Sequence, residues 1–186
     1  MVFFNSSVLS DPPEDLRQSS ELVPAADQRF AMRMSRQLFD SLWILSKKEE
    51  IPRADIVRRA LGLYALALEE EKKGNLIGFA HLNSDGHAKV DKLIRLQATP
   101  KEFPLHEKRS DSNDYCRYEM RMTSDLFSRL GFLSEEEEIP RADIVRRALG
   151  LYAKAVEAKA KSQIIAFVKI CQENSVEVVR LLKLDN

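Results

Sequence analysis

The chain has 186 residues, of which 29 are Lys or Arg and 29 are Asp or Glu, so its formal net charge is zero. Its hydrophobic fraction of 44% provides enough apolar side chains for one globular domain or two small ones. No apolar stretch approaches the length of a membrane span, and the first ten residues lack the basic flank and cleavage pattern of a secretory signal. We therefore expect a cytoplasmic protein that does not contact a membrane.

The sequence has no pattern typical of a metal site, a disulfide framework or a catalytic centre. Cys116 and Cys171 lie 55 positions apart without a CxxC pair, and the three His residues do not cluster with them. No nucleophile or acid stands beside a matching base. We expect two reduced thiols, no metal, no cofactor and no enzymatic activity.

An internal repeat organises the chain. The repeated sequence is IPRADIVRRALGLYA, which stands at 51–65 and again, unchanged, at 139–153, an offset of 88 residues. At this offset 34 of the 68 residues from 29 to 96 are identical to their counterparts in the second copy. A duplication explains this identity. We divide the chain into a flexible N-terminal segment (1–28), a first repeat with a hairpin (29–97), a linker (98–116) and a second repeat with a hairpin (117–186).

Each repeat begins with the pattern of a strand and a short helix. Residues 29–35 and 117–123 alternate polar or small side chains with apolar ones, as a strand with one buried face does. Ser35 and Thr123 then stand where they can cap a helix whose leucines recur at spacings of four and three. The alternation predicts a strand, and the leucine spacing predicts a helix of about three turns.

A longer amphipathic helix is expected after Pro52 in the first repeat and after Pro140 in the second. Gly62 and Gly150 fall inside this helix, where glycine costs about 1 kcal/mol relative to alanine. Either the close approach of another helix or simple tolerance accounts for these glycines.

Two apolar segments around a polar turn end each repeat, at 76–96 and 164–184, and predict a β-hairpin. The first strand of each repeat needs a partner, because a lone strand leaves both of its edges open. The other repeat provides that partner on the same chain, although the linker is long enough to permit pairing between two chains as well. We expect an α+β, mainly helical fold in which the repeats form an intrachain pseudo-dimer and each is followed by a β-hairpin.

Pairing of the two strands gives a ribbon with two unlike faces. The inner face carries large apolar side chains: Phe30, Met32, Met34, Tyr118, Met120 and Met122. The outer face carries Arg29, Ala31, Arg33, Arg117, Glu119 and Arg121. A two-stranded ribbon fits the DNA major groove, where arginine can donate two hydrogen bonds to guanine O6 and N7. An exposed strand arginine taken alone is more often a solvated charge, but the repeat and the helices that follow favour DNA contact.

These residues resemble the ribbon-helix-helix DNA-binding proteins of the MetJ/Arc/CopG type. The likeness covers about 46 residues of each repeat and rests on FAMRMS at 30–35, the leucines of the first helix and IPRADIVRRAL at 51–61. It does not include the hairpins. The resemblance implies tandem ribbon-helix-helix units on one chain, with the ribbon in the major groove and amides at the start of each second helix on phosphate.

Carried over position by position, the resemblance implies a set of residues that contact DNA bases: Arg29, Ala31, Arg33, Arg117, Glu119 and Arg121. It implies phosphate contacts by the backbone amides near Arg53 and Ala54, and near Arg141 and Ala142, where the helix dipole favours an anion. The family often has a hydroxyl residue where the two prolines precede these amides, so a side-chain cap is lost here.

The two repeats differ in charge near these phosphate sites. Residues 29–74 carry ten basic and seven acidic side chains, whereas 117–161 carry nine and eight, chiefly because the lysines at 47–48 become glutamates at 135–136. Acidic side chains directly before the second phosphate site repel phosphate at short range. They are either a solvated turn or the sign of a weakened second half.

The paired arginines of the second helices offer another basic patch. Arg58 and Arg59, and likewise Arg146 and Arg147, are expected to pair with acids at neighbouring turns, such as Asp55 and Asp143, rather than to contact phosphate.

The leading functional hypothesis is a sequence-specific, double-stranded DNA-binding regulator of transcription. The alternative is a protein-interaction module, such as an antitoxin-like partner binder with weak or no DNA binding. The candidate partners are double-stranded DNA, a second copy of the chain and another protein. Because Ala31 in one strand corresponds to Glu119 in the other, we expect the DNA site to be an imperfect palindrome.

Overall fold

The structure, a computed structural model, describes residues 27–85, 87–94, 96, 115–171 and 175–184. Its elements in chain order are β1 (Gln28–Ser35), α1 (Arg36–Lys48), α2 (Arg53–Lys72), β2 (Leu76–Leu82), β3 (Ala88–Ile94), β4 (Tyr115–Met122), α3 (Ser124–Glu136), α4 (Arg141–Ala160), β5 (Ile164–Ile170) and β6 (Val176–Leu182). The N-terminal segment 1–28 and the linker 98–116 lie outside the described residues, except at 27–28 and 115–116.

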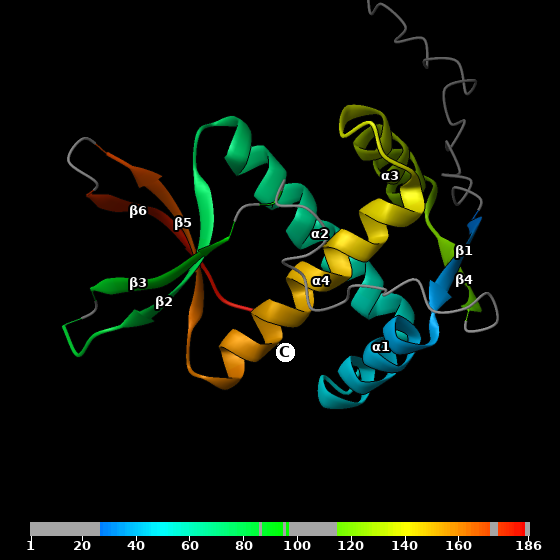
Figure 1. Cartoon of the computed structure of the whole chain (residues 1–186), viewed down its shortest axis with the longest axis horizontal. Coiled ribbons are helices and arrows are strands. Elements are labelled where there is room, and N and C mark those ends of the chain that lie inside the picture. The colour runs from blue at the N-terminus through cyan, green and yellow to red at the C-terminus, as the bar shows by residue number, and fades with distance from the viewer. Residues whose placement is uncertain (1–26, 86, 95, 97–114, 172–174, 185–186) are drawn as a thin grey trace, which may run out of the picture.

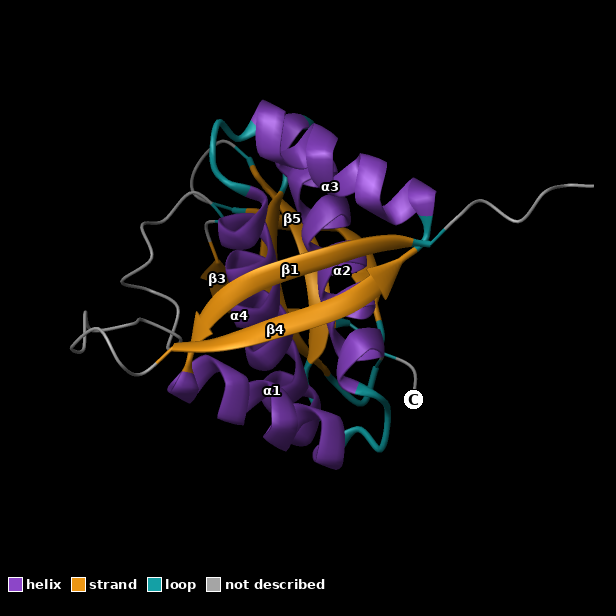
Figure 2. Cartoon of the chain, turned by 90° about the vertical axis from the view of Figure 1, so that its right-hand side faces the viewer, coloured by secondary structure: helices purple, strands orange, loops and turns teal. Residues whose placement is uncertain are grey.

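The elements form three layers along the longest axis of the molecule (Figure 1). An antiparallel ribbon of β1 and β4 lies at one end, and a four-stranded antiparallel sheet of order β3-β2-β5-β6 lies at the other. Helices α2 and α4 pack against each other between them. Figure 2 shows the ribbon in front of these two helices, with α1 and α3 on its two sides. Within the described residues, the helices therefore support the ribbon from behind and no other element lies in front of it.

The expected fold class, mainly helical with a separate β-hairpin after each repeat, is wrong. Strand β2 pairs with β3 and β5 pairs with β6, but β2 also pairs with β5, so the four strands form one sheet. The fold is α+β, with four helices and two antiparallel sheets in the described part of the chain. As separate hairpins, β2–β3 and β5–β6 would each leave one edge of an apolar strand, β2 or β5, unpaired. The pairing of β2 with β5 removes both of these open edges.

Local signals account for the start of each repeat. The hydroxyl oxygens of Ser35 and Thr123 accept hydrogen bonds from the amides of Leu38 (3.2 Å) and Leu126 (3.3 Å), so both residues cap a helix as predicted. The leucines that these helices bury in the core are Leu38, Leu42, Leu45, Leu130 and Leu133. The caps and the leucine spacing place α1 and α3 against the ribbon.

Helices α2 and α4 begin directly after Pro52 and Pro140, as the sequence predicts. Both helices are buried along one side, and the large rings of Tyr64 and Tyr152 lie fully in the core. Gly62 is exposed, and apart from the neighbouring backbone of its own helix no atom of the described residues lies within 4 Å of the place where its side chain would begin. Simple tolerance, rather than a close helix contact, therefore accounts for this glycine.

A pseudo-two-fold axis relates the two repeats. Ala31 pairs with Glu119 in the ribbon, and Gly78 pairs with Ala166 in the sheet. Each of these pairs joins two residues that are 88 positions apart and therefore equivalent in the two repeats. In an antiparallel pairing of two equivalent strands, a residue meets its own equivalent only at the centre of symmetry. The axis therefore passes through the middle of the ribbon and the middle of the sheet.

Candidate nucleic-acid interface

The outer face of the β1–β4 ribbon brings together all six residues that the sequence analysis assigned to base contact. Their side chains are all exposed: Arg29, Ala31, Arg33, Arg117, Glu119 and Arg121. Arg29 lies opposite Arg121, and Arg33 lies opposite Arg117. The four arginines thus occupy two pairs, about 13 Å apart along the ribbon at the usual rise of an antiparallel strand. The outer face is a compact, positively charged strip.

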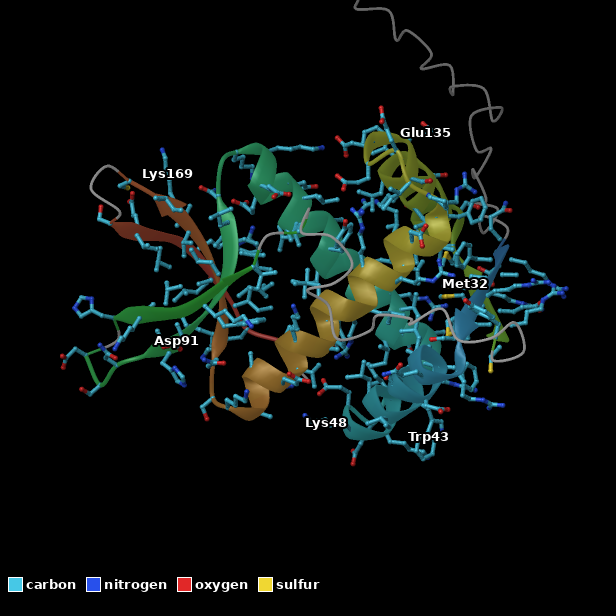
Figure 3. All side chains as sticks on the ribbon, viewed as in Figure 1. Met32, Trp43, Lys48, Asp91, Glu135 and Lys169 are labelled. Carbon is cyan, nitrogen blue, oxygen red and sulfur yellow. The ribbon has the colours of Figure 1, made fainter. Side chains whose placement is uncertain are left out.

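The inner face of the ribbon fixes this strip in place. All six of its apolar side chains are buried, as predicted: Phe30, Met32, Met34, Tyr118, Met120 and Met122. Figure 3 shows Met32 at the ribbon end of the molecule, where β1 faces the helices. Burial raises the pKa of the Tyr118 hydroxyl above its usual value of 10, and the nearby positive charge of Arg53 partly opposes this rise. A slip of one strand by one residue would expose the three apolar side chains of that strand, so the pairing of the strands is strongly specified.

An ion pair lies at the centre of the strip. The Glu119 carboxylate contacts the guanidinium of Arg117 on the same strand, and both side chains are at least half exposed. Arg117 in turn lies opposite Arg33 on the neighbouring strand. An exposed pair of this kind contributes little to stability and can be broken by a competing anion or hydrogen-bond donor. The strip keeps a net positive charge, because four arginines stand against one glutamate.

The first turns of α2 and α4 are attached to the ribbon by two equivalent arginines. The Arg58 guanidinium donates to the carbonyl oxygen of Arg121 on β4 at 2.9 Å, and Arg146 donates to the carbonyl oxygen of Arg33 on β1 at 2.6 Å. Each arginine comes from one repeat and reaches the strand of the other. These contacts set the start of each long helix beside an end of the ribbon.

The same two arginines also form the ion pairs that the sequence predicts. Arg58 contacts the Asp55 carboxylate, and Arg146 contacts that of Asp143, both at 2.5 Å and both three residues apart in one helix. The hydrogen bonds to the ribbon were not anticipated. The helical spacing of Asp and Arg indicates a pair, whereas a bond to a strand carbonyl in the other repeat has no signal in the sequence.

The amides assigned to phosphate lie at the starts of these helices. Pro52 and Pro140 precede the helices and provide no side-chain cap. The carbonyl oxygen of Pro52 accepts from the amides of Asp55 (2.9 Å) and Ile56 (3.1 Å), and Pro140 accepts likewise in the second repeat. The amides that come before these, of Arg53, Ala54, Arg141 and Ala142, have no acceptor inside their helix. Such groups, together with the helix dipole, favour an anion.

The side chains of Arg53 and Arg141 stack on aromatic rings, a feature that the sequence analysis missed. The Arg53 guanidinium lies 5.0 Å from the centre of the Phe39 ring, and Arg141 lies 4.6 Å from that of Phe127. Both pairs are kept in the two repeats, which is the signal that could have revealed them. In the second repeat the Arg141 guanidinium lies close to Gly131, 2.8 Å from where a β-carbon would stand, whereas the first repeat has Trp43 at the equivalent position.

The acidic run before the second helix of the second repeat is partly neutralised. Glu136 pairs with Lys72 on α2, and the Glu137 carboxylate lies 3.4 Å from the Arg147 guanidinium. Figure 3 shows Lys48 and Glu135 on opposite sides of the molecule, one near the end of each short helix. The two flanks of the ribbon therefore differ in charge, although less than the sequence alone suggests.

Other kinds of site have little support in the described residues. No group of three or more His, Cys, Asp or Glu side chains within them is arranged to bind a metal ion. Cys116 and Cys171 are both free thiols. No helix in the same part of the chain combines the length and apolarity that crossing a lipid bilayer requires.

Comparison with known proteins adds no assignment: no protein-family model, no curated protein and no solved structure matches this chain. The resemblance to ribbon-helix-helix proteins therefore rests on the residues quoted above.

Proposed function

We propose that this chain is a sequence-specific, double-stranded DNA-binding regulator of transcription. The observation that carries the proposal is the outer face of the β1–β4 ribbon, where four exposed arginines stand in two opposed pairs on a strip backed by buried side chains. In the proposed complex the ribbon enters the major groove and the arginines contact guanine edges. The base-contacting set comprises Arg29, Ala31, Arg33, Arg117, Glu119 and Arg121.

The starts of α2 and α4 support the same proposal. They lie at the two ends of the ribbon, since Arg58 and Arg146 bond to its backbone there. In the complex the amides near Arg53 and Ala54, and near Arg141 and Ala142, contact phosphates on either side of the groove. Phosphate contacts of this kind position the ribbon, and the strip of arginines provides the preference for a sequence.

The resemblance to ribbon-helix-helix proteins agrees with this proposal and extends it. It suggests a regulator without a cofactor or enzymatic activity that acts in the cytoplasm. The proposed DNA site has two related halves, because the ribbon itself has two equivalent halves about the pseudo-two-fold axis.

The second candidate function is a protein-interaction module, such as an antitoxin-like partner binder. Three large apolar side chains on the outer sides of the short helices favour it: Trp43, Ile44 and Phe132, each more than half exposed. Figure 3 shows Trp43 on the outside of α1. Isolated exposed apolar residues are common, so this observation weighs less than the arginine strip.

Binding to a random pool of duplex DNA, followed by selection and a gel shift at low and moderate salt, tests the proposal. Arg33→Ala or Arg121→Ala should each cost about 1 to 3 kcal/mol on the selected site. Arg180→Ala is the matched control, because this exposed arginine lies on β6 in the sheet at the far end of the molecule. Circular dichroism confirms that each variant folds.

The outcomes separate the two functions. Loss of affinity in the ribbon variants alone supports DNA recognition by the ribbon. Failure of the wild type to bind DNA even at low salt would remove this function and favour the protein-interaction module. Equal affinity in all three variants would show that another surface binds DNA.

A further inference from the structure

The two short helices expose equivalent faces on opposite sides of the molecule. Figure 2 shows α1 on one side of the ribbon and α3 on the other. Since both helices bury their leucines toward the core, their exposed faces point outward, in opposite directions. The exposed side chains of α1, which we call the α1 flank, are Arg36, Gln37, Asp40, Trp43, Ile44, Lys47 and Lys48. Those of α3, which we call the α3 flank, are Asp125, Ser128, Arg129, Phe132, Glu135 and Glu136.

The two flanks carry opposite charge. The α1 flank has three basic side chains and one acidic side chain, whereas the α3 flank has one basic and three acidic side chains. The difference is largest at the ends of the helices, where Lys47 and Lys48 are equivalent to Glu135 and Glu136. Lys72 on α2 pairs with Glu136 and neutralises one of the three acids. Two acids then stand against one base, so the α3 flank remains negative.

Each flank also exposes a large apolar side chain between its charged ends. Ile44 on α1 is 57% exposed, and its equivalent on α3, Phe132, is 62% exposed. Trp43 lies beside Ile44 and is 52% exposed, with the Lys47 ammonium 5.7 Å from the centre of its ring. Protein interfaces commonly have large apolar and aromatic side chains at the centre and polar ones at the rim. Both flanks have this composition.

The direction of the helices sets which charges meet when two copies lie side by side. The pseudo-two-fold axis exchanges α1 and α3, so these helices run in opposite directions when viewed along it (Figure 2). A second copy placed beside the first in the same orientation brings its α1 flank against the α3 flank of the first, with the two helices antiparallel. Arg36 at the start of one helix then lies near Glu135 at the end of the other, and Lys47 lies near Asp125. Coulomb attraction acts at both ends.

Contacts between like flanks are unfavourable. Two α1 flanks packed antiparallel bring Arg36 near Lys47, and two α3 flanks packed antiparallel bring Asp125 near Glu135. Parallel packing of like flanks sets each of these charges beside its own copy. Repulsion between like charges therefore disfavours both kinds of like contact and leaves the contact between unlike flanks as the favoured one.

We propose that copies of this chain associate head to tail, with the α1 flank of one copy against the α3 flank of the next. A contact between unlike surfaces leaves one flank free at each end, so it extends into a row instead of closing into a two-fold dimer. All copies in the row have the same orientation, and their ribbons lie on the same side. Because the contact consists of exposed charges around few apolar side chains, the association of the free protein is weak and depends on salt.

The row has a consequence for DNA, and this consequence rests on the proposed function. With all ribbons on one side, neighbouring copies occupy consecutive sites on one duplex, and the sites are direct repeats because the copies share one orientation. Binding to such sites is cooperative, because DNA holds neighbouring copies at high local concentration. The association itself does not require DNA. It is therefore tested without DNA, so that its failure is distinct from a failure of DNA binding.

Light scattering on the full chain at low salt, from low to high micromolar concentration, tests the association. The mean mass should rise above that of a single chain, 21.3 kDa, and should continue to rise without a plateau at two chains. The emission of Trp43, the single tryptophan of the chain, should shift to shorter wavelength over the same range, because the contact buries its exposed ring. Both changes should be smaller in about 1 M salt, where charges are screened beyond about 3 Å.

Charge reversals test which surfaces meet. Arg36→Glu with Lys47→Glu makes both ends of the α1 flank negative, and Asp125→Lys with Glu135→Lys makes both ends of the α3 flank positive. Each variant then opposes like charges in its own row and should associate about tenfold or more weakly than the wild type. An equimolar mixture of the two variants should associate again, because each flank meets the opposite charge on the other variant.

The matched control is Lys89→Glu with Lys169→Glu, which makes the same change of charge on exposed residues of the four-stranded sheet. It should leave the association unchanged, and circular dichroism confirms that each variant folds. A single-chain mass for the wild type at every concentration in low salt would overturn the proposal and leave the proposed DNA binding untouched. Undiminished association of either flank variant alone, or a mixture that stays at the single-chain mass, would overturn it as well.

Discussion

Ala31 lies directly opposite Glu119 at the centre of the β1–β4 ribbon, on the axis that relates the two repeats. These two residues are each other's equivalents, and they are the only unlike pair among the equivalent positions of the outer ribbon face. The arginine pairs on either side of them are alike, because Arg29 is equivalent to Arg117 and Arg33 to Arg121. The chemical asymmetry of the arginine strip is therefore confined to its middle.

We predict that Glu119→Ala makes the preferred DNA site more symmetric, chiefly at its central base pairs. Glu119 can accept a hydrogen bond from cytosine N4, whereas Ala31 can make only a small apolar contact. The variant also releases Arg117 from its ion pair, which should raise the nonspecific affinity for DNA at low salt. The decrease of this affinity with rising salt should become steeper, by as much as about one additional phosphate contact contributes. Selection from a random DNA pool measures the first effect and a salt titration the second. Unchanged central preferences would show that this carboxylate does not contact bases.

We predict opposite effects for two alanine substitutions at glycine. Gly62→Ala should raise the free energy of unfolding by about 0.5 to 1 kcal/mol, because the site is an exposed helix interior with open space around it. Gly78→Ala should lower it by about 1 to 3 kcal/mol, because the new β-carbon would lie 2.6 Å from the Lys92 carbonyl oxygen in the neighbouring strand. Urea denaturation of both variants checks this. A gain in stability for Gly78→Ala would contradict the close approach of β3 to β2.

Adjacent carboxylates at the end of α2 should give opposite dependences on pH. Hydrogen bonds from Lys73 (2.8 Å) and Asn75 (2.7 Å) lower the pKa of Glu70 below its ordinary value of 4.5. Burial, together with the charge of Glu137, raises the pKa of Glu71 above the same value. Glu70 therefore contributes stability that is present above pH 4.5 and lost as the pH falls through its lowered pKa. Glu71 contributes stability that is present below pH 4.5 and lost as the pH rises through its raised pKa.

The test replaces each carboxylate by its amide. At pH 7, Glu70→Gln should lower the free energy of unfolding by about 1 kcal/mol, and Glu71→Gln should raise it by less than that, since the side chain is only partly buried. Both differences should shrink in urea denaturation at pH 4. Changes of the same sign in the two variants at pH 7 would refute this assignment of the two sites.

Arg58→Ala and Arg146→Ala should each lower the free energy of unfolding by about 0.5 to 1.5 kcal/mol, since each leaves a ribbon carbonyl oxygen without its arginine donor. Amide hydrogen exchange should also become faster near Arg121 in the first variant and near Arg33 in the second. Arg129→Ala, an exposed arginine on α3, is the control. A loss no larger than that of the control would mean that these arginines do not attach the long helices to the ribbon.

The sequence by itself determined the local elements of this protein. The capping residues Ser35 and Thr123, the helix starts after Pro52 and Pro140, and the buried inner face of the ribbon all follow from patterns of near neighbours. Such patterns decide local structure because capping and amphipathic spacing involve residues within one or two turns or strands. The repeat also revealed which distant positions are equivalent to each other, and no single segment carries this information.

Only the tertiary structure decided which distant edges and faces meet. The pairing of Gly78 with Ala166 joins two hairpins into one sheet. The alternation of side chains along a strand does not determine which other strand will pair with its open edge. The bonds of Arg58 and Arg146 to the strand of the other repeat depend likewise on how the long helices cross behind the ribbon. The central position of Ala31 and Glu119 needs the register of β1 on β4, which the burial of both inner faces sets.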